Sequence, residues 1–345
     1  MRTAALVAVL VSVVVVAAFA QDVTTIVGSG SNLPRPLYDA WVRAFNQRNA
    51  KAQARYLPLG TAESIKQISN GSGDFGGGEV PLTADVLAGS RTKLMVLPVA
   101  LVAVVPIYNL PGVSENLHFS GNVLADIYLG KVRNWNDPEL TSLNPGVKLP
   151  AQPIQVVHRS EGKGANYILS DFLSKTSPAF RQKVGRSASP NWPLGKSANR
   201  NEDMAEEVKN TAGAIGYVEL NYASSGLSVG AVQNAAGRFV KASRQTVENA
   251  CDAAIRSGVR DLQMSLTNVP GQESYPISSF TYVYLPVNPP DKVRGHVVTS
   301  FIAFALGDDG QSMAADANYG VLPEPVIKKA RSQLSLLTTG GPAKN

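Results

Sequence analysis

The chain has little cysteine: a single residue, Cys251, in 345. One cysteine cannot form an internal disulfide, which excludes the class of small secreted proteins stabilised by disulfides. Cys251 also lies far from the N-terminus, so it is not the lipid-modified first residue of a lipoprotein. We expect Cys251 to be a small buried side chain rather than a reactive thiol.

Histidine is also scarce, and the patterns of common cofactor sites are missing. His118, His158 and His296 lie far apart, and none occurs in a metal-binding spacing such as H-E-x-x-H. No glycine-rich segment reads G-x-x-x-x-G-K-[ST], and the glycines at 28 and 30 lack the third glycine of a dinucleotide-binding loop. We therefore expect no metal and no cofactor.

The charge is only mildly unbalanced, at +6 for the whole chain. The runs of lysine and arginine are short and are not interleaved with aromatic residues, so nucleic-acid binding is not expected. A mildly basic surface would instead help to attract a small anion.

Residues 1–20 have the features of a signal peptide. Arg2 precedes an apolar stretch over residues 4–17, and Ala18-Phe19-Ala20 forms a cleavage site before Gln21. We expect the mature protein to be exported to the periplasm. Removing 20 of 345 residues leaves 325, a length that suggests two domains.

Strand and helix patterns alternate along the mature chain, which predicts an α/β fold. The expected strands are residues 24–27, 94–108 (broken by Pro98 and Pro106), 154–157, 215–220 and 275–285. The expected helices are residues 37–45, 123–130, 167–175, 245–261, 297–306 and 325–334. The runs at 94–108 and 275–285 are candidates for crossings between the domains.

Small residues precede two of the predicted helices in the N-terminal region. Residues 28–34 (GSGSNLP) follow the first strand and enter a helix through proline. The free N–H groups and the dipole of that helix start form a place where an anion can bind. Leu57 to Gly60 lead into Thr61, which we interpret as a helix cap, with a role in ligand binding as the alternative.

Two further loops carry charged residues. Three glycines at 76–78 would let the backbone approach a ligand before Glu79, although a tight surface turn with a solvated acid is the alternative. Residues 159–166 (RSEGKGAN) join Arg159 and Lys163 to a helix start, and Glu161 could hold the Arg159 guanidinium in place. This set would bind an anion if the groups converge, and would otherwise be a charged surface turn.

The chain resembles the periplasmic phosphate-binding proteins of high-affinity phosphate ABC transporters (the PstS family). The matching segments run in order over nearly the whole mature chain: residues 28–41, 66–68, 74–76, 126–131 with Trp135, 159–164, 213–219, 275–278 and 318–320 with Leu322-Pro323. The resemblance implies a two-lobed α/β fold with a hinge and a ligand cleft between the lobes. It further implies lobes formed by residues 22–106 plus 279–340 and by residues 107–278.

The resemblance also implies the function and the site. Such a protein captures inorganic phosphate, as a monomer, and delivers it to a membrane permease. Glu79 corresponds to the family's acid that accepts the phosphate proton, Arg159 to its arginine and Glu161 to the acid that braces this arginine. The remaining ligand-binding positions are Asn32, Leu33, Thr61, Lys163, Gly164 and Ala165.

The sequence departs from the family pattern at several of these positions. Lys163 and Ala165 replace two hydroxyl residues, and Glu79 is one methylene longer than the family's aspartate. A carboxylate at 79 still favours a protonated oxyanion over sulfate, which has no proton to share. We hypothesise that Lys163 enters the pocket and either favours more anionic ligands or weakens discrimination.

Two other functions remain as alternatives. The first is a paralogue that is tuned to another oxyanion or serves as a sensor. The segment Gly226-Leu227-Ser228-Val229-Gly230 also matches the G-x-S-x-G pattern of a hydrolase, with Ser228 as nucleophile and His296 as the only downstream histidine. Because residues 231–236 have no helical pattern and short motifs often occur by chance, we do not expect catalysis.

Overall fold

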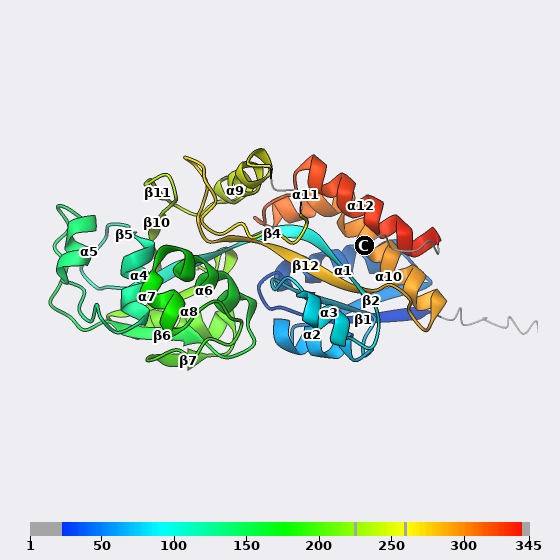
Figure 1. The fold of residues 1–345 in the computed structure, drawn as a ribbon, viewed down its shortest axis with the longest axis horizontal. Helices are drawn as coiled ribbons and strands as arrows, with labels where there is room; N and C mark the ends of the chain where they lie inside the picture. Colours follow the sequence, from blue (N-terminus) through cyan, green and yellow to red (C-terminus); the bar gives the residue numbers. More distant parts are fainter. Residues whose placement is uncertain (1–22, 224–225, 259–260, 340–345) are drawn as a thin grey trace, which may run out of the picture.

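The computed structural model describes residues 23–223, 226–258 and 261–339. The predicted signal peptide lies outside the described residues. Within them, the strands form a nine-stranded mixed sheet in the order β2-β1-β3-β12-β4-β8-β6-β7, with β9 also paired to β4, and a small three-stranded sheet, β11-β10-β5. Helices surround both ends of the large sheet (Figure 1), which confirms the predicted α/β class.

The strands span the following residues: β1 Thr24–Gly30, β2 Ala52–Leu57, β3 Phe75–Gly78, β4 Leu94–Asn109, β5 His118–Phe119, β6 Gln155–Arg159, β7 Lys196–Ala198, β8 Ala214–Glu219, β9 Ser228–Val229, β10 Ala231–Gln233, β11 Phe239–Val240 and β12 Ser278–Pro286. β1 pairs in parallel with β2 and β3, and β6 pairs in parallel with β7 and β8. β12 and β4 run antiparallel between these two parallel groups. We call β2, β1 and β3 with their helices the first half, and β8, β6 and β7 with theirs the second half.

The helices span α1 Arg35–Arg48, α2 Thr61–Ser69, α3 Ala84–Gly89, α4 Gly121–Tyr128, α5 Pro138–Leu143, α6 Gly164–Thr176, α7 Pro178–Lys183, α8 Asn201–Asn210, α9 Arg244–Arg256, α10 Lys292–Ala305, α11 Asp308–Asp316 and α12 Glu324–Thr339, with a 3₁₀ turn, η1, over Leu220–Tyr222. Every helix predicted from periodicity is present. The predicted helix 245–261 ends early, at Arg256, because Gly258 takes a left-handed conformation (φ +89°) that stops it.

β4 is one uninterrupted strand, whereas the sequence predicted strands broken at Pro98 and Pro106. Pro98 lies at a bulge, where the register with β12 shifts between Thr281 and Tyr282, and a bulge tolerates a residue without an N–H donor. The strand pairs with β12 from Leu94 to Ala103 and with β8 from Val104 to Asn109. β4 therefore joins the two halves of the sheet, as expected for a crossing.

The first glycine-rich segment also differs from its prediction. Gly28 to Gly30 belong to β1 and pair with β3, whereas the chain turns only at residues 31–34. A Cβ on Gly28 would lie 2.1 Å from the Phe75 ring, so glycine is needed for β1 to pack against that ring. The predicted turn is therefore the end of the strand.

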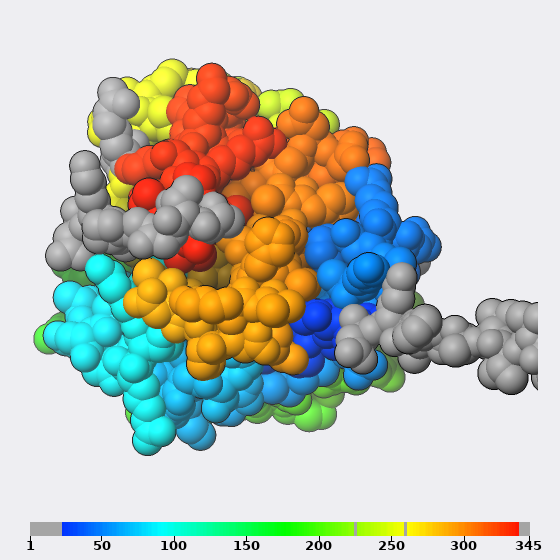
Figure 2. Space-filling view, turned by 90° about the vertical axis from the view of Figure 1, so that its right-hand side faces the viewer, coloured from blue at the N-terminus to red at the C-terminus, as the bar shows by residue number. Residues whose placement is uncertain are grey.

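Segments from both ends of the described chain form one surface of the first half. Figure 2 shows α1 and β2 (blue) beside α10 to α12 (orange to red) on this face. Trp41 of α1 is fully buried, and its indole N–H donates to the Gly310 carbonyl of α11. Cys251 is buried in α9, as predicted. Within the described ranges no helix combines the length and apolarity needed to cross a bilayer.

Candidate functional site

Thr61 and Glu79 meet where the first half faces the second. Thr61 is the first residue of α2, and its hydroxyl donates a hydrogen bond of 3.0 Å to Glu79 Oε2. The N-cap residue is Gly60, with no side-chain cap bond, so the interpretation of Thr61 as a cap was wrong. Its hydroxyl instead contacts the acid that follows β3.

Glu79 is a fully buried carboxyl group with no cation bonded to it within the described chain. Burial raises its pKa from 4.5 to about 7, although hydrogen bonds from Ser31, Thr61 and Thr281 act in the opposite direction. The Thr281 hydroxyl of β12 donates to Oε1 at 3.3 Å. The alternative of a solvated acid in a surface turn is therefore excluded.

The glycines before Glu79 have a different role from the one predicted. A Cβ on Gly78 would lie 2.5 Å from Thr61 Cγ2, and one on Gly76 would lie 2.8 Å from Ser64 Oγ. These glycines let α2 pack closely against β3. Their effect on the site is therefore indirect, because they bring Thr61 to Glu79.

Arg159 ends β6 in the second half and is 1 % exposed. Its Nη1 donates to Asn201 Oδ1 at 2.6 Å, and its Nη2 donates to the Asn199 carbonyl at 2.7 Å. Arg159 Nε and Asn201 Nδ2 are buried without a hydrogen-bond partner in the described part of the chain. Two buried donors thus lack an acceptor, which is a costly arrangement unless a ligand supplies one.

The predicted brace of Arg159 is wrong. Glu161 is exposed and makes no hydrogen bond or ion pair with Arg159; the two neutral groups of Asn199 and Asn201 hold the guanidinium. Burial lowers the pKa of Arg159, and the nearby Tyr217 and Glu202 partly oppose this effect. The guanidinium therefore keeps a positive charge that no bonded carboxylate neutralises.

Lys163 caps α6 and extends toward the opposite half. Its Nζ lies 3.4 Å from the position that a Cβ would take on Gly60, and Gly60 has a φ of +107°. Burial, followed by the charge of Arg159, lowers the pKa of Lys163. No hydrogen bond or ion pair of its ammonium to a described residue is present, so a second cation faces the same region.

The starts of α2 and α6 meet at this point. The Ala62 N–H donates to the Gly162 carbonyl at 3.1 Å, and a Cβ on Gly164 would lie 3.0 Å from Thr61 Oγ1. Ala165 follows in the first turn of α6 and is buried. First-turn N–H groups have no partner within their helix, so two positive helix ends point into one region.

Asn32 and Leu33 lie in the turn after β1, and both are buried. The Tyr222 hydroxyl donates across to the Asn32 carbonyl at 3.0 Å. The Leu33 N–H donates to Ser31 Oγ at 3.1 Å, so it is occupied and not, as predicted, free for a ligand. The Asn32 amide makes no side-chain hydrogen bond within the described chain.

Thr61, Glu79, Lys163 and Gly164 therefore lie together. Arg159 lies close enough to Lys163 to lower its pKa, and Asn32 is bonded to the second half through Tyr222. The sequence interpretation missed Ser31, Thr281, Asn199 and Asn201. Ser31 lies within the GSGSN segment, where its hydroxyl was a visible candidate. Asn199 precedes α8 and Asn201 is its first residue. No local pattern distinguishes either from ordinary residues at a helix start.

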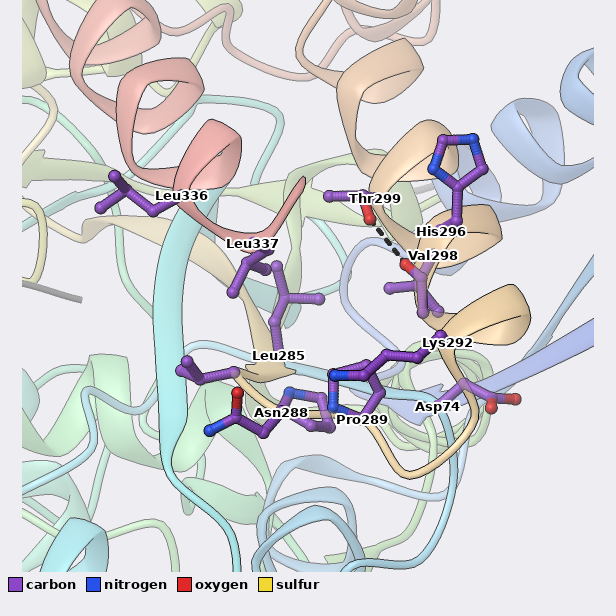
Figure 3. A pocket seen from close by; sticks show the side chains of 13 residues that line it. Asp74, Leu285, Asn288, Pro289, Lys292, His296, Val298, Thr299, Leu336 and Leu337 are labelled. Atoms are coloured by element: carbon purple, nitrogen blue, oxygen red, sulfur yellow. Dashed lines mark hydrogen bonds between the residues drawn. The ribbon is translucent and has the colours of Figure 1, made fainter. Parts of the chain in front are cut away.

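The hydrolase alternative is not supported by the geometry. Ser228 lies in β9 beside Tyr108 and is followed by β10, whereas a nucleophile requires a helix after the strand. His296 lies on α10, where it lines a pocket of about 290 Å³ with Asp74 and Lys292 (Figure 3). Among the described residues, no group of histidine, cysteine, aspartate or glutamate could hold a metal ion.

Comparisons with known proteins identify the family of the chain. A family model described as "PBP superfamily domain" matches residues 15–309. The phosphate-binding protein PstS of Xylella fastidiosa (strain Temecula1) is 34 % identical over 304 residues, covering 88 % of this chain and 82 % of the relative. PstS of Pasteurella multocida is 34 % identical over 311 residues, covering 90 % and 89 %.

Solved structures share the fold. A phosphate ABC transporter substrate-binding protein from Clostridium perfringens, solved with bound phosphate, superposes with a TM-score of 0.62 at 20 % identity, covering 87 % of this chain and all of the other. The two-lobed α/β architecture predicted from the sequence is therefore confirmed. The chain belongs to the PBP superfamily and, within it, to the family of phosphate-binding proteins PstS.

Proposed function

We propose that this protein captures inorganic phosphate in a cleft between two lobes and delivers it to the permease of an ABC transporter. The observation that carries the proposal is the convergence of two helix starts and the buried Arg159 on one region that contains a buried carboxyl. Both PstS relatives are named as phosphate-binding proteins. Neither a metal nor a cofactor has a role in this function.

The lobes follow from the path of β4 and β12. We propose that residues 22–106 with 279–340 form the first lobe and residues 107–278 the second. β4 leaves the first lobe near Ala103, and β12 returns at Ser278, which pairs with Ala103. α9 is assigned to the second lobe by sequence, although Glu248 accepts a hydrogen bond of 3.0 Å from the Val321 N–H of the first.

Phosphate fits the charges of the site better than sulfate does. Arg159, Lys163 and the N–H groups of Thr61, Gly164 and Ala165 offer donors and positive charge. In its ionised form, which predominates above its raised pKa of about 7, Glu79 accepts the proton of HPO₄²⁻, whereas sulfate has no proton and would place an oxygen against a lone pair of that carboxylate. Asn32 would donate through its side-chain amide. Each hydrogen bond to a charged group is worth about 1.5–3 kcal/mol.

Lys163 extends this proposal. Because its ammonium faces Gly60 and has no acidic partner in the described chain, we propose that it contacts the bound anion and offsets the hydroxyl donors absent at 163 and 165. Calorimetry with phosphate, sulfate and arsenate should give different relative affinities for the wild type and Lys163→Ser. Identical affinities would place Lys163 outside the site.

The location and assembly belong to the same proposal. We propose a periplasmic monomer, because capture before a membrane permease requires export, and Arg2 with the apolar run after it supplies an export signal. Purified protein should be denatured and the released anions identified by ion chromatography. Phosphate in about equal amount to protein is the expected result; release of a different oxyanion would overturn the choice of ligand.

A further inference from the structure

A segment beside the proposed cleft is bonded to both lobes. Residues 261–268, which we call the interlobe strap, follow α9 and belong to no strand of either sheet. Its apolar side chains Leu262, Met264 and Leu266 are buried, whereas the residues between them are polar. This alternation is that of an extended chain with one face on the core, so its other face is free to make polar contacts.

Contacts from the strap to the first lobe are made near β3 and β12. The Leu82 N–H donates to Gln263 Oε1 at 2.9 Å. The Tyr282 hydroxyl of β12 donates to the Met264 carbonyl at 3.5 Å. These bonds fix one end of the strap next to the segment that carries Glu79.

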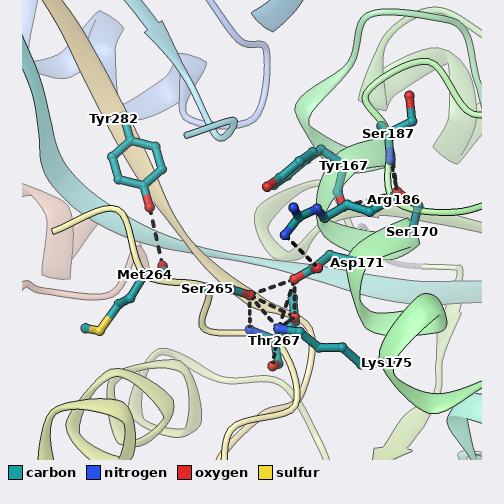
Figure 4. Close-up of polar contacts among 10 residues, drawn as sticks. All are labelled: Tyr167, Ser170, Asp171, Lys175, Arg186, Ser187, Met264, Ser265, Thr267 and Tyr282. Carbon is teal, nitrogen blue, oxygen red and sulfur yellow. Dashed lines mark hydrogen bonds and ion pairs between the residues drawn. The ribbon is translucent and has the colours of Figure 1, made fainter. Parts of the chain in front are cut away.

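Contacts to the second lobe are made at α6 and centre on Asp171 (Figure 4). The Ser265 hydroxyl donates to Asp171 Oδ2 at 2.6 Å, and the Thr267 hydroxyl donates to the same oxygen. The Lys175 ammonium donates to Ser265 Oγ and Thr267 Oγ1, each at 2.7 Å. Arg186 approaches the other oxygen, Asp171 Oδ1, at 3.5 Å.

Asp171 is a buried charge that is almost fully compensated. Burial by itself would raise its pKa, but the charge of Lys175 and the hydroxyls of Ser265 and Thr267 more than offset this, and the pKa is lowered. Asp171 is therefore ionised at neutral pH, and its bonds to the strap are of the strong, charge-assisted kind. Loss of the two hydroxyls would leave a buried carboxylate with two of its acceptor sites unsatisfied.

The cluster adjoins the proposed phosphate site. A cavity of about 10 Å³ is lined by Glu79 together with Asp171, Ser265 and Thr267. α6 carries Asp171 in its second turn and Gly164 and Ala165 in its first. A bond at Asp171 therefore holds the helix whose N-terminus faces the anion.

We propose that the interlobe strap fastens the closed form of the protein, with Asp171 as the positioning residue that holds the N-terminus of α6 against the first lobe. This inference rests on the proposed phosphate function. Opening of the cleft would move α6 away from Leu82 and Tyr282 of the first lobe. The strap could then keep either its bonds to Asp171 or its bonds to Leu82 and Tyr282, but not both. The strap then slows ligand release without affecting the first encounter, which occurs in the open form.

The test is the kinetics of phosphate binding in the full mature chain, followed by stopped-flow fluorescence. The double variant Ser265→Ala/Thr267→Val should release phosphate about tenfold faster or more and should bind it at an unchanged association rate. Thr267→Ser keeps the hydroxyl and should behave as the wild type. Asp309→Asn removes an exposed ion pair to Arg48 in the first lobe and should also have no effect.

The outcomes separate the two proposals. Failure of the wild type to bind phosphate overturns the proposed function. Binding by the wild type, with a release rate in the double variant within twofold of it, overturns the strap. The strap proposal is also overturned if the association rate of the double variant falls by the same factor as its release rate rises. If the double variant does not fold, Thr267→Val alone is measured, with hydrogen exchange of residues 261–268 expected to rise in the phosphate-bound protein.

Discussion

Gly164, at the start of α6, lies directly against the Glu79 carboxyl: a Cβ on Gly164 would be 1.7 Å from Oε2 and 2.7 Å from Cδ. The two residues belong to opposite lobes of the proposed division. A binding residue of one lobe thus contacts the backbone of the other, with no room for a methyl group between them. We therefore expect closure of the cleft to depend on this fit.

Gly164→Ala should therefore weaken phosphate binding at least tenfold. The added methyl would overlap Glu79 in the closed form, whereas the open form has no such contact, so the ligand-free protein should keep its melting temperature within a few degrees. Titration calorimetry and thermal unfolding measure the two effects. Gly89→Ala is the control, because nothing lies within 4 Å of its Cβ position. Equal affinities of Gly164→Ala and the wild type would mean that the lobes do not close in this way.

The buried Glu79 predicts a dependence of stability on pH. Its pKa is raised from 4.5 to about 7 in the folded protein, so the folded state holds a proton that the unfolded state has lost between these values. The stability from this group is complete below pH 4.5 and is lost as the pH rises through 7, a change of about 3 kcal/mol.

Urea unfolding of ligand-free protein at pH 5 and pH 8 should show this loss. Glu79→Gln cannot titrate and should have a smaller difference between the two pH values. Part of the difference should remain, because burial also raises the pKa of Glu219. A difference of the same size in the wild type and Glu79→Gln would contradict the assignment to Glu79.

Arg159→Lys should reduce phosphate affinity about tenfold or more although it keeps the charge. A lysine cannot donate to Asn201 Oδ1 and the Asn199 carbonyl and also present a planar pair of donors to an anion. Lost hydrogen bonds to a charged ligand cost about 1.5–3 kcal/mol each. Calorimetry measures the change, and Arg48→Lys, at an exposed pair with Asp309 within the first lobe, is the control. Unchanged affinity of Arg159→Lys would remove Arg159 from the ligand contacts.

Asp74 predicts a stability effect that is independent of the ligand. Its Oδ2 accepts the Val27 N–H at 2.6 Å, and its Oδ1 accepts Arg294 Nε at 2.8 Å. Asp74→Ala leaves the partly buried Val27 N–H and the Arg294 guanidinium without this partner and should cost about 2–3 kcal/mol of unfolding free energy. Asp309→Ala removes an exposed pair and should cost less than about 1 kcal/mol. Chemical denaturation compares the two; similar losses would show that the Asp74 bonds contribute little.

The elements with a strong periodic pattern could be predicted from the sequence. α1 was predicted because Leu37, Trp41 and Phe45 repeat at helical spacing, and all three are buried on one face. The strand predicted over residues 215–220 corresponds to β8. Prediction from local pattern failed where a tertiary contact determines the secondary structure. Pro98 remains in β4 because a bulge accommodates it, and Gly28 remains in β1 because Phe75 packs against it.

The site was predictable to the extent that its groups lie in loops before helices. Thr61 and Glu161 show the limit. Capping of α2 by Thr61 and bracing of Arg159 by Glu161 are both local arrangements, whereas the observed partners of Thr61 and Arg159 are Glu79 and Asn201, which come from distant segments. Hydrogen bonds between remote residues have no signal in the spacing of a single sequence.

β4 has a consequence for how this molecule comes apart. The residues from Leu94 to Asn109, apart from Val99 at the bulge, pair with β12 or β8, and the change of partner falls between Ala103 and Val104. The sheets of both lobes contain part of this one strand. Unfolding of one lobe would therefore disorder a strand that the other lobe needs, so we expect the chain to unfold as a single cooperative unit, with one calorimetric transition.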